Sequence, residues 1–128
     1  MAAPETAGDR RKRALVIDDD ASVRRALVDV VAMLGYEADA AANGPQGIAL
    51  FVRSRYDVVL TDLMMPGMTG WQVLDTIREL NLRIPVILVT GAPVPPDDRR
   101  LARPGVALVR KPLDAGALEA ALARVLPR

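Results

Sequence analysis

The stretch Ala14-Leu15-Val16-Ile17-Asp18-Asp19-Asp20 passes directly from four apolar residues to three aspartates. A short, unbroken apolar run is typical of a strand that is buried on both faces, as in a parallel sheet. An amphipathic helical pattern follows, and Gly35 ends it. Its apolar positions are Val23, Ala26, Leu27, Val30, Val31 and Leu34. Either Asp20 or Ser22 can cap the start of this helix.

The same succession of apolar strand and helix recurs along the chain. Further strands are predicted at residues 36–42, 58–61, 85–89 and 106–109, and a helical pattern follows each of them. Five such units predict an α/β fold in which about five helices cover both faces of a parallel sheet. The fourth helix is predicted to be short or irregular, because Pro93, Pro95 and Pro96 leave only residues 97–103 before Pro104.

Composition excludes several classes of site. The chain has 128 residues, enough for one domain, and its core must be aliphatic because 51% of the residues are hydrophobic but only 3% are aromatic. Without cysteine or histidine, thiol nucleophiles, imidazole bases and zinc sites with such ligands are excluded. No apolar run reaches the roughly 18 residues of a membrane helix, and residues 1–13 do not resemble a signal peptide. We therefore expect a cytoplasmic protein without a membrane partner.

Basic charge is concentrated near the beginning of the chain, where residues 10–13 are Arg-Arg-Lys-Arg. Residues 1–12 are predicted to form a disordered tail, and residues 13–128 a single folded domain. A basic run can contact nucleic acid, but here no aromatic residues are interleaved and no recognition helix follows. We interpret the run as a solvated tail and expect no direct contact with nucleic acid.

Polar residues stand where the predicted strands end. Asp18 to Asp20 follow the first strand, Asp62 the third, Thr90 the fourth and Lys111 the fifth. Ligands of open α/β sheets bind at the carboxyl ends of the strands. Individually, the aspartates could be turn residues that cap helices, and Lys111 could be a solvated lysine. The peptide bond between Lys111 and Pro112 can be cis. Four strand ends with such residues are better explained by one shared pocket.

The residue types in this pocket indicate phosphoryl transfer. Carboxylates held close together repel one another and need a cation or a shared proton. Oxygen ligands without histidine or cysteine favour a hard ion, Mg²⁺ before Zn²⁺. Lys111 adds a positive charge and Thr90 a hydroxyl donor. A carboxylate nucleophile can attack phosphorus in line while the cations neutralise charge on the equatorial oxygens.

From residue 13 to residue 126 the sequence resembles the receiver domain of bacterial two-component response regulators. The resemblance rests on LVIDDD at residues 15–20, TDLMMPGMTG at 61–70, VTG at 89–91 and RKPL at 110–113. It implies a doubly wound, flavodoxin-like sheet with the strand order 2-1-3-4-5. It also identifies the folded domain, residues 13–128, as a receiver domain.

The resemblance implies a role for each residue of the pocket. Asp62 is expected to accept the phosphoryl group, and Lys111 to pair with the phosphoryl oxygens. Thr90 is expected to move toward the phosphoryl group and so couple it to the face formed by the fourth helix, the fifth strand and the last helix. The metal ligands are expected to be Asp19 and Asp62 directly, Asp18 mainly through water, and the backbone carbonyl of Met64. No organic cofactor is expected.

The resemblance also implies partners. A sensor histidine kinase or a histidine phosphotransfer protein would donate the phosphoryl group, and a downstream protein would bind the switched face; a homodimer is compatible with this. The chain would be a signalling domain that assists its own phosphorylation and dephosphorylation, not an enzyme with a separate substrate. Whether it acts alone or within a longer regulator or hybrid kinase stays open.

Two departures from the family pattern concern signalling. The residue three before the lysine is usually aromatic and swings inward on activation, but here it is Leu108. The proline-rich segment shortens the fourth helix. We therefore expect competent phosphorylation with an atypical readout.

Two other functions compete with this interpretation. Asp18-x-Asp20 resembles the opening motif of haloacid dehalogenase-type phosphatases, although Ser22 stands where that family has threonine or valine. The second is an interaction module that keeps the fold without the chemistry. Such a module would have no reason to keep a cluster of carboxylates that repel one another, so the cluster argues against this alternative.

Overall fold

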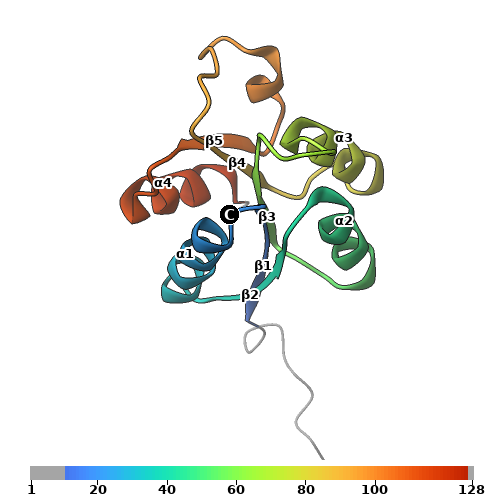
Figure 1. Ribbon diagram of the computed structural model, residues 1–128, viewed down its shortest axis with the longest axis vertical. Coiled ribbons are helices and arrows are strands. Elements are labelled where there is room, and N and C mark those ends of the chain that lie inside the picture. The colour runs from blue at the N-terminus through green and yellow to red at the C-terminus, as the bar shows by residue number, and fades with distance from the viewer. Residues whose placement is uncertain (1–10, 127–128) are drawn as a thin grey trace, which may run out of the picture.

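Five strands of the computed structural model form one parallel sheet in the order β2-β1-β3-β4-β5 (Figure 1). They are β1 (Lys12–Ile17), β2 (Tyr36–Ala41), β3 (Val58–Asp62), β4 (Val86–Thr90) and β5 (Val106–Arg110). The structure describes residues 11–126. Both the parallel sheet and its strand order confirm the prediction. Every residue of β3 and β4 is buried, which explains why these strands are continuous apolar runs.

Helices cover both faces of the sheet (Figure 1). On one face lie α1 (Ala21–Met33) and α4 (Ala115–Val125), and on the other α2 (Gly44–Arg53) and α3 (Gly70–Leu80). Each layer encloses its own apolar cluster, centred on Leu27, Leu60 and Leu118 on the first face and on Leu15, Leu74 and Leu88 on the second. Leu, Ile and Val dominate both clusters, as the composition predicted.

Local side chains begin and end the helices. Asp20, not Ser22, caps α1, because its Oδ1 accepts hydrogen bonds from the N–H groups of Ser22 at 2.8 Å and Val23 at 3.2 Å. Asn43 caps α2, and Thr69 forms a capping box at the start of α3. Gly35 follows α1 with φ of 96°, a left-handed conformation that glycine adopts readily.

The segment between β4 and β5 departs from the expected set of about five helices. Within residues 11–126 it contains a single 3-10 helix, η2 (Arg99–Ala102), and the described part of the chain has four α-helices. Proline removes backbone donors and clashes with a preceding carbonyl, so Pro93, Pro95, Pro96 and Pro104 leave no room for an α-helix. The fourth helix is therefore reduced to one turn, which projects beyond the sheet (Figure 1).

The predicted tail of residues 1–12 falls mostly outside the described residues. Lys12, however, is the first residue of β1 and pairs with Tyr36 of β2, so this residue belongs to the sheet. The peptide bond between Lys111 and Pro112 is cis. Among the described residues, no helix is long and apolar enough to cross a membrane.

Candidate functional site

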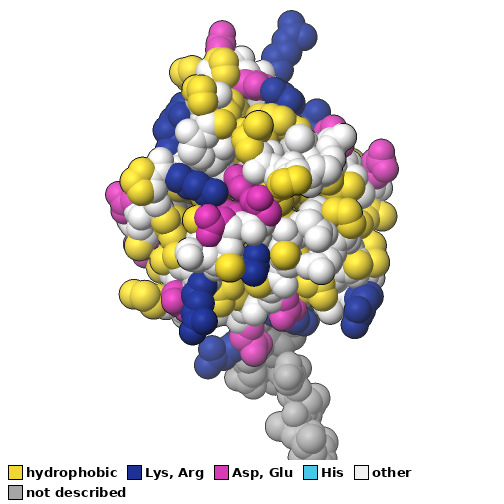
Figure 2. All heavy atoms as spheres, in the orientation of Figure 1, with side chains coloured by type: hydrophobic (Ala, Val, Ile, Leu, Met, Phe, Trp, Pro, Cys, Tyr) yellow, Lys and Arg dark blue, Asp and Glu magenta, His cyan; other side chains and the backbone are white. Residues whose placement is uncertain are grey.

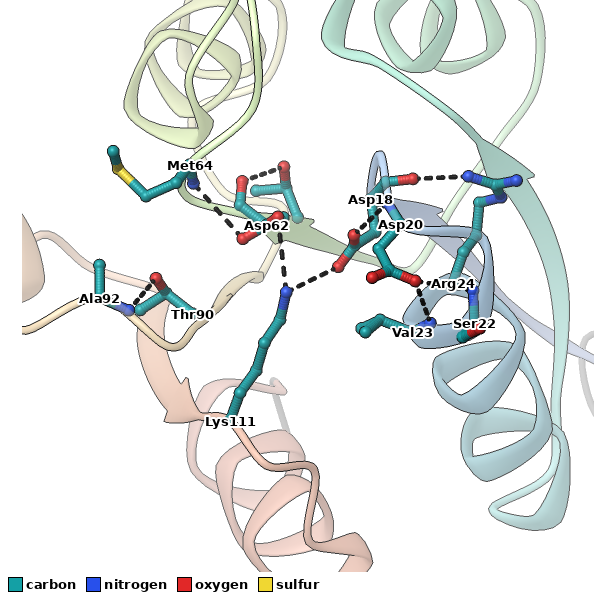
Figure 3. Close-up of polar contacts among 11 residues, drawn as sticks. Asp18, Asp20, Ser22, Val23, Arg24, Asp62, Met64, Thr90, Ala92 and Lys111 are labelled. Carbon is teal, nitrogen blue, oxygen red and sulfur yellow. Dashed lines mark hydrogen bonds and ion pairs between the residues drawn. The ribbon is translucent and has the colours of Figure 1, made fainter.

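Asp18, Asp62 and Lys111 meet at the carboxyl edge of the sheet (Figure 3). The register pairs Ile17 of β1 with Thr61 of β3, so the residues that follow them, Asp18 and Asp62, leave adjacent strands together. Lys111 follows β5, and its Nζ lies 3.2 Å from Asp18 Oδ2 and 3.5 Å from Asp62 Oδ2. In the orientation of Figure 1, Figure 2 shows acidic side chains gathered near the middle of this face with a basic side chain beside them.

Asp18 is the most enclosed member of the site, with a side chain that is 0% exposed. Its backbone N–H donates to the carbonyl of Ala41 at 3.1 Å, and its Oδ1 accepts from the N–H of Asp20 at 2.9 Å. Oδ2 lies near Lys111 but accepts no well-directed hydrogen bond from any described residue. A buried carboxylate oxygen with unused lone pairs destabilises the fold unless a cation or a water molecule binds to it.

Three carboxylates could hold a metal ion. Asp18, Asp19 and Asp62 each offer one oxygen, and these oxygens all lie within 4.8 Å of one another. Asp18 and Asp62 are buried, whereas Asp19 is exposed, so the cluster is open to solvent on one side. An oxygen-only donor set, with Asp18 Oδ2 lacking a hydrogen bond, fits a hard divalent cation such as Mg²⁺.

The charges of the site perturb one another. Burial raises the pKa of Asp62, and the charge of Asp18 raises it further, while Lys111 opposes both. For Lys111, burial lowers the pKa, but Asp18 and Asp62 together outweigh burial, so the pKa is raised overall. Lys111 therefore stays charged at neutral pH. The two buried carboxylates share it as a counterion, and a further cation would relieve their remaining repulsion.

The other two predicted residues lie beside this cluster. Thr90 ends β4, and its hydroxyl accepts a hydrogen bond from the N–H of Ala92 at 3.0 Å while its carbonyl accepts from the N–H of Lys111 at 2.9 Å. Met64 donates its N–H to Asp62 Oδ1 over 3.4 Å, and it is 63% exposed. The structure thus brings together Asp18, Asp19, Asp62 and Lys111, with Thr90 at the same edge and the Met64 backbone beside Asp62.

Two contributors escaped the sequence reasoning. Arg24 of α1 donates from Nη1 to the carbonyl of Asp18 at 2.8 Å (Figure 3), a contact that no sequence pattern indicated. Gly70, at the start of α3, packs so closely on the strand end that a Cβ there would lie 2.3 Å from the carbonyl oxygen of Asp62. Its position after Pro66 and Gly67 indicated a turn, but the close approach depends on the tertiary structure.

Comparison with known proteins agrees with this geometry. A family model described as the response regulator receiver domain matches residues 14–123. The sensor histidine kinase RcsC of Salmonella typhi is 34% identical over 110 residues, which are 85% of this chain but 12% of the kinase. The regulatory protein AtoC of Escherichia coli is 42% identical over 79 residues, 62% of this chain and 17% of that protein. The chain thus spans a small part of these relatives.

Solved structures show the same fold. The chemotaxis protein CheY4 of Vibrio cholerae superposes with a TM-score of 0.83 at 28% identity, covering 91% of this chain and 100% of the other. The response regulator TrrA of Thermotoga maritima, solved with Mg²⁺ and beryllium fluoride, superposes with a TM-score of 0.80 at 30% identity, covering 90% and 99%. A further structure holds TrrA in complex with the histidine kinase ThkA, with a TM-score of 0.80.

Proposed function

The chain belongs to the response regulator receiver domain family, and from that premise we propose that Asp62 accepts a phosphoryl group in an Mg²⁺-dependent reaction. The observation that carries the proposal is the position of Asp62, a buried carboxylate 3.5 Å from Lys111 and within the cluster of Asp18 and Asp19. Such a carboxylate is a nucleophile whose product, an acyl phosphate, would have counter-charges beside it.

The residues present are suited to hold the ion. Asp19 and Asp62 would bind Mg²⁺ directly, together with the backbone carbonyl of Met64, and Asp18 would bind it mainly through water. Mg²⁺ supplies positive charge to the equatorial oxygens of the transferred group. The solved relative TrrA, which carries Mg²⁺ and beryllium fluoride, supports this assignment.

The chemical step needs little from the protein beyond orientation and charge. A carboxylate oxygen of Asp62 would form the new P–O bond while the P–N bond of a phosphohistidine breaks, and the histidine would keep the electron pair and take up a proton. Lys111 would pair with a phosphoryl oxygen, and the Thr90 hydroxyl would donate to another. Thr90 can do so while it still accepts from the N–H of Ala92, since a hydroxyl both donates and accepts.

The partners follow from the reaction. The phosphoryl donor would be a sensor histidine kinase or a histidine phosphotransfer protein in the cytoplasm, and the ThkA–TrrA complex supports a kinase partner. A downstream protein, or a second copy of the chain, would read the face formed by residues 91–105, β5 and α4. The kinase RcsC and the regulator AtoC both contain regions similar to this chain, so an independent receiver and a receiver within a longer protein are both compatible with the matches.

Intact-protein mass spectrometry after treatment with acetyl phosphate and Mg²⁺, followed by peptide mapping, tests the proposal. We expect one added phosphoryl group, located on Asp62. A label on Asp18 would instead favour phosphatase chemistry of the haloacid dehalogenase type. Absence of Mg²⁺ binding at millimolar concentration, with no change on Asp19→Asn, would favour an interaction module without the chemistry.

A further inference from the structure

We infer that Arg24 is a positioning residue for the metal site, acting through the backbone of the aspartate turn and not through any contact with the ion or the phosphoryl group. The inference rests on the proposed function, because it concerns how the chain orients the carboxylates that would hold Mg²⁺. It assigns to α1 a role beyond covering the sheet.

Arg24 holds the aspartate turn on both sides of Asp19. Its guanidinium Nη1 donates to the carbonyl of Asp18 at 2.8 Å (Figure 3), and its backbone N–H donates to the carbonyl of Asp20 at 2.9 Å. Asp18 lies just beyond the last paired residue of β1, so its carbonyl has no partner in the sheet. Among the described residues, the guanidinium of Arg24 is its only hydrogen-bond donor.

Asp19 is the ligand that most needs this support. Its side chain is exposed, and it accepts no hydrogen bond and forms no ion pair with any other residue in the range 11–126. Its direction therefore depends on the peptide units on either side, and the guanidinium of Arg24 holds the carbonyl of the preceding unit, that of Asp18. Asp18, in turn, has its Oδ1 fixed by the N–H of Asp20, which directs Oδ2 toward Lys111 and Asp62.

The charge of Arg24 does not compete with a metal ion for the carboxylates. In the described part of the chain, its guanidinium forms no ion pair with Asp18, Asp19 or Asp20 and donates instead to a neutral carbonyl. A positive charge this close to the site can only weaken cation binding by Coulomb repulsion. Loss of the charge and loss of the hydrogen bond therefore change Mg²⁺ affinity in opposite directions.

Arg25 provides a matched control. It is the next residue of the same helix, it is exposed, and it makes no side-chain hydrogen bond or ion pair with any described residue. Arg25→Met therefore removes one positive charge from α1 without removing a contact to the aspartate turn. Arg24→Met removes the same charge together with the bond to the carbonyl of Asp18.

The experiment compares Mg²⁺ titrations of the wild-type chain, Arg24→Met and Arg25→Met. The amide chemical shifts of residues 18–20 and 62 monitor binding. We expect Arg24→Met to raise the Kd for Mg²⁺ about tenfold, as when an outer-shell partner of a metal ligand is lost. Arg25→Met should leave the Kd unchanged or slightly lower. The labelling of Asp62 by acetyl phosphate should need about tenfold more Mg²⁺ in Arg24→Met, yet reach a rate within about twofold of wild type at saturation.

An Arg24→Met variant that binds Mg²⁺ as tightly as Arg25→Met would overturn the inference. So would a rate at saturating Mg²⁺ that stays tenfold low, because Arg24 would then act on the chemical step. If Arg24→Met does not fold, the guanidinium groups of the wild-type chain are measured instead. We expect slower rotation and slower proton exchange for the guanidinium of Arg24 than for that of Arg25. Equal rates for the two would contradict the hydrogen bond from Arg24 to the carbonyl of Asp18. Failure of wild type to bind Mg²⁺ would instead refute the proposed function.

Discussion

The acidic site at the carboxyl edge of the sheet and the segment of residues 91–105, which leaves that edge after β4, are held in different ways. Asp18 and Asp62 leave adjacent, fully buried strand ends and are enclosed within the fold. The other segment has one 3-10 turn and is tied to α3 by side chains: Arg100 lies 3.8 Å above the ring of Trp71, and Arg103 pairs with Asp75 at 2.7 Å. The proposed chemistry is thus placed on buried strand ends, whereas the neighbouring surface depends on a few side-chain contacts.

This difference bears on how a signal could leave the site. In the family pattern, a helix and an inward-swinging aromatic residue follow β4, but here η2 and Leu108 occupy their places. Leu108 is partly buried and packs against the core cluster of Leu15 and Leu88. Because the described chain has no α-helix between β4 and β5, we propose that the 91–105 segment itself is the element that responds to phosphorylation.

The largest expected effect is at the rigid site itself. Asp62→Asn should abolish labelling by acetyl phosphate, because it removes the proposed nucleophile, and it should also stabilise the fold. Since the pKa of Asp62 is raised in the folded chain, its stabilising contribution is present below pH ~4 and is lost as the pH rises. At neutral pH the ionised carboxylate therefore destabilises the wild type.

Urea unfolding of both proteins between pH 4 and pH 7 checks this prediction. The advantage of Asp62→Asn should be greatest at pH 7 and shrink toward pH 4, where the wild-type carboxyl takes up its proton. An equal difference at both pH values would contradict a pKa of Asp62 that burial and the charge of Asp18 raise in the folded chain.

Loss of the shared counterion should be the next largest effect. Lys111→Met leaves two buried carboxylates without their cation, and removing one partner of such a pair costs about 3 kcal/mol. Mg²⁺ should restore more stability to Lys111→Met than it adds to wild type, since the ion would supply the missing charge. Urea unfolding with and without Mg²⁺ measures the loss of stability and its recovery, and Arg99→Met, which changes an exposed arginine, is the charge control. The same increase in stability on adding Mg²⁺ to wild type and to Lys111→Met would contradict the prediction.

A smaller effect is expected where side chains hold the 91–105 segment. Arg100→Met removes the stack on Trp71, a contact worth about 1 kcal/mol near the surface, together with the ion pair between Arg100 and Asp98. Amide hydrogen exchange in residues 92–105 should then speed up about fivefold, while labelling of Asp62 stays unchanged. Arg99→Met, which changes the adjacent exposed arginine, should alter neither. Faster exchange throughout the sheet would show that the stack supports the whole fold.

The subtlest effect concerns the readout. Beryllium fluoride with Mg²⁺, a mimic of the phosphoryl group, should change amide exchange mainly in residues 91–105, and Trp71, the single tryptophan, should report this by fluorescence. Asp62→Asn with the same additions is the control. A conventional shift of β5 with an inward movement at Leu108 would refute an atypical readout.

The sequence predicted local features well because they depend on neighbouring residues. Apolar runs indicated the strands, the 3.6-residue period indicated the helices, and Asp20 and Gly35 marked the ends of α1. Prolines correctly indicated a disrupted fourth helix, but not that it would shrink to a single 3-10 turn. The packing of that turn on Trp71 and Asp75 has no local signature, since the partners are more than 20 residues away.

For the site, the sequence by itself determined which residues stand at the strand ends: a carboxylate after β1, a carboxylate at the end of β3, a hydroxyl at the end of β4 and a lysine after β5. Only the tertiary structure decided which of them touch. The register of β1 on β3 brings Asp18 beside Asp62, and the return of the chain from β5 places Lys111 between them. Arg24 reaches the carbonyl of Asp18 because α1 packs back on the sheet. The residue type at each strand end can be read from the local sequence, whereas the distance between two side chains depends on strand register and on packing between distant segments.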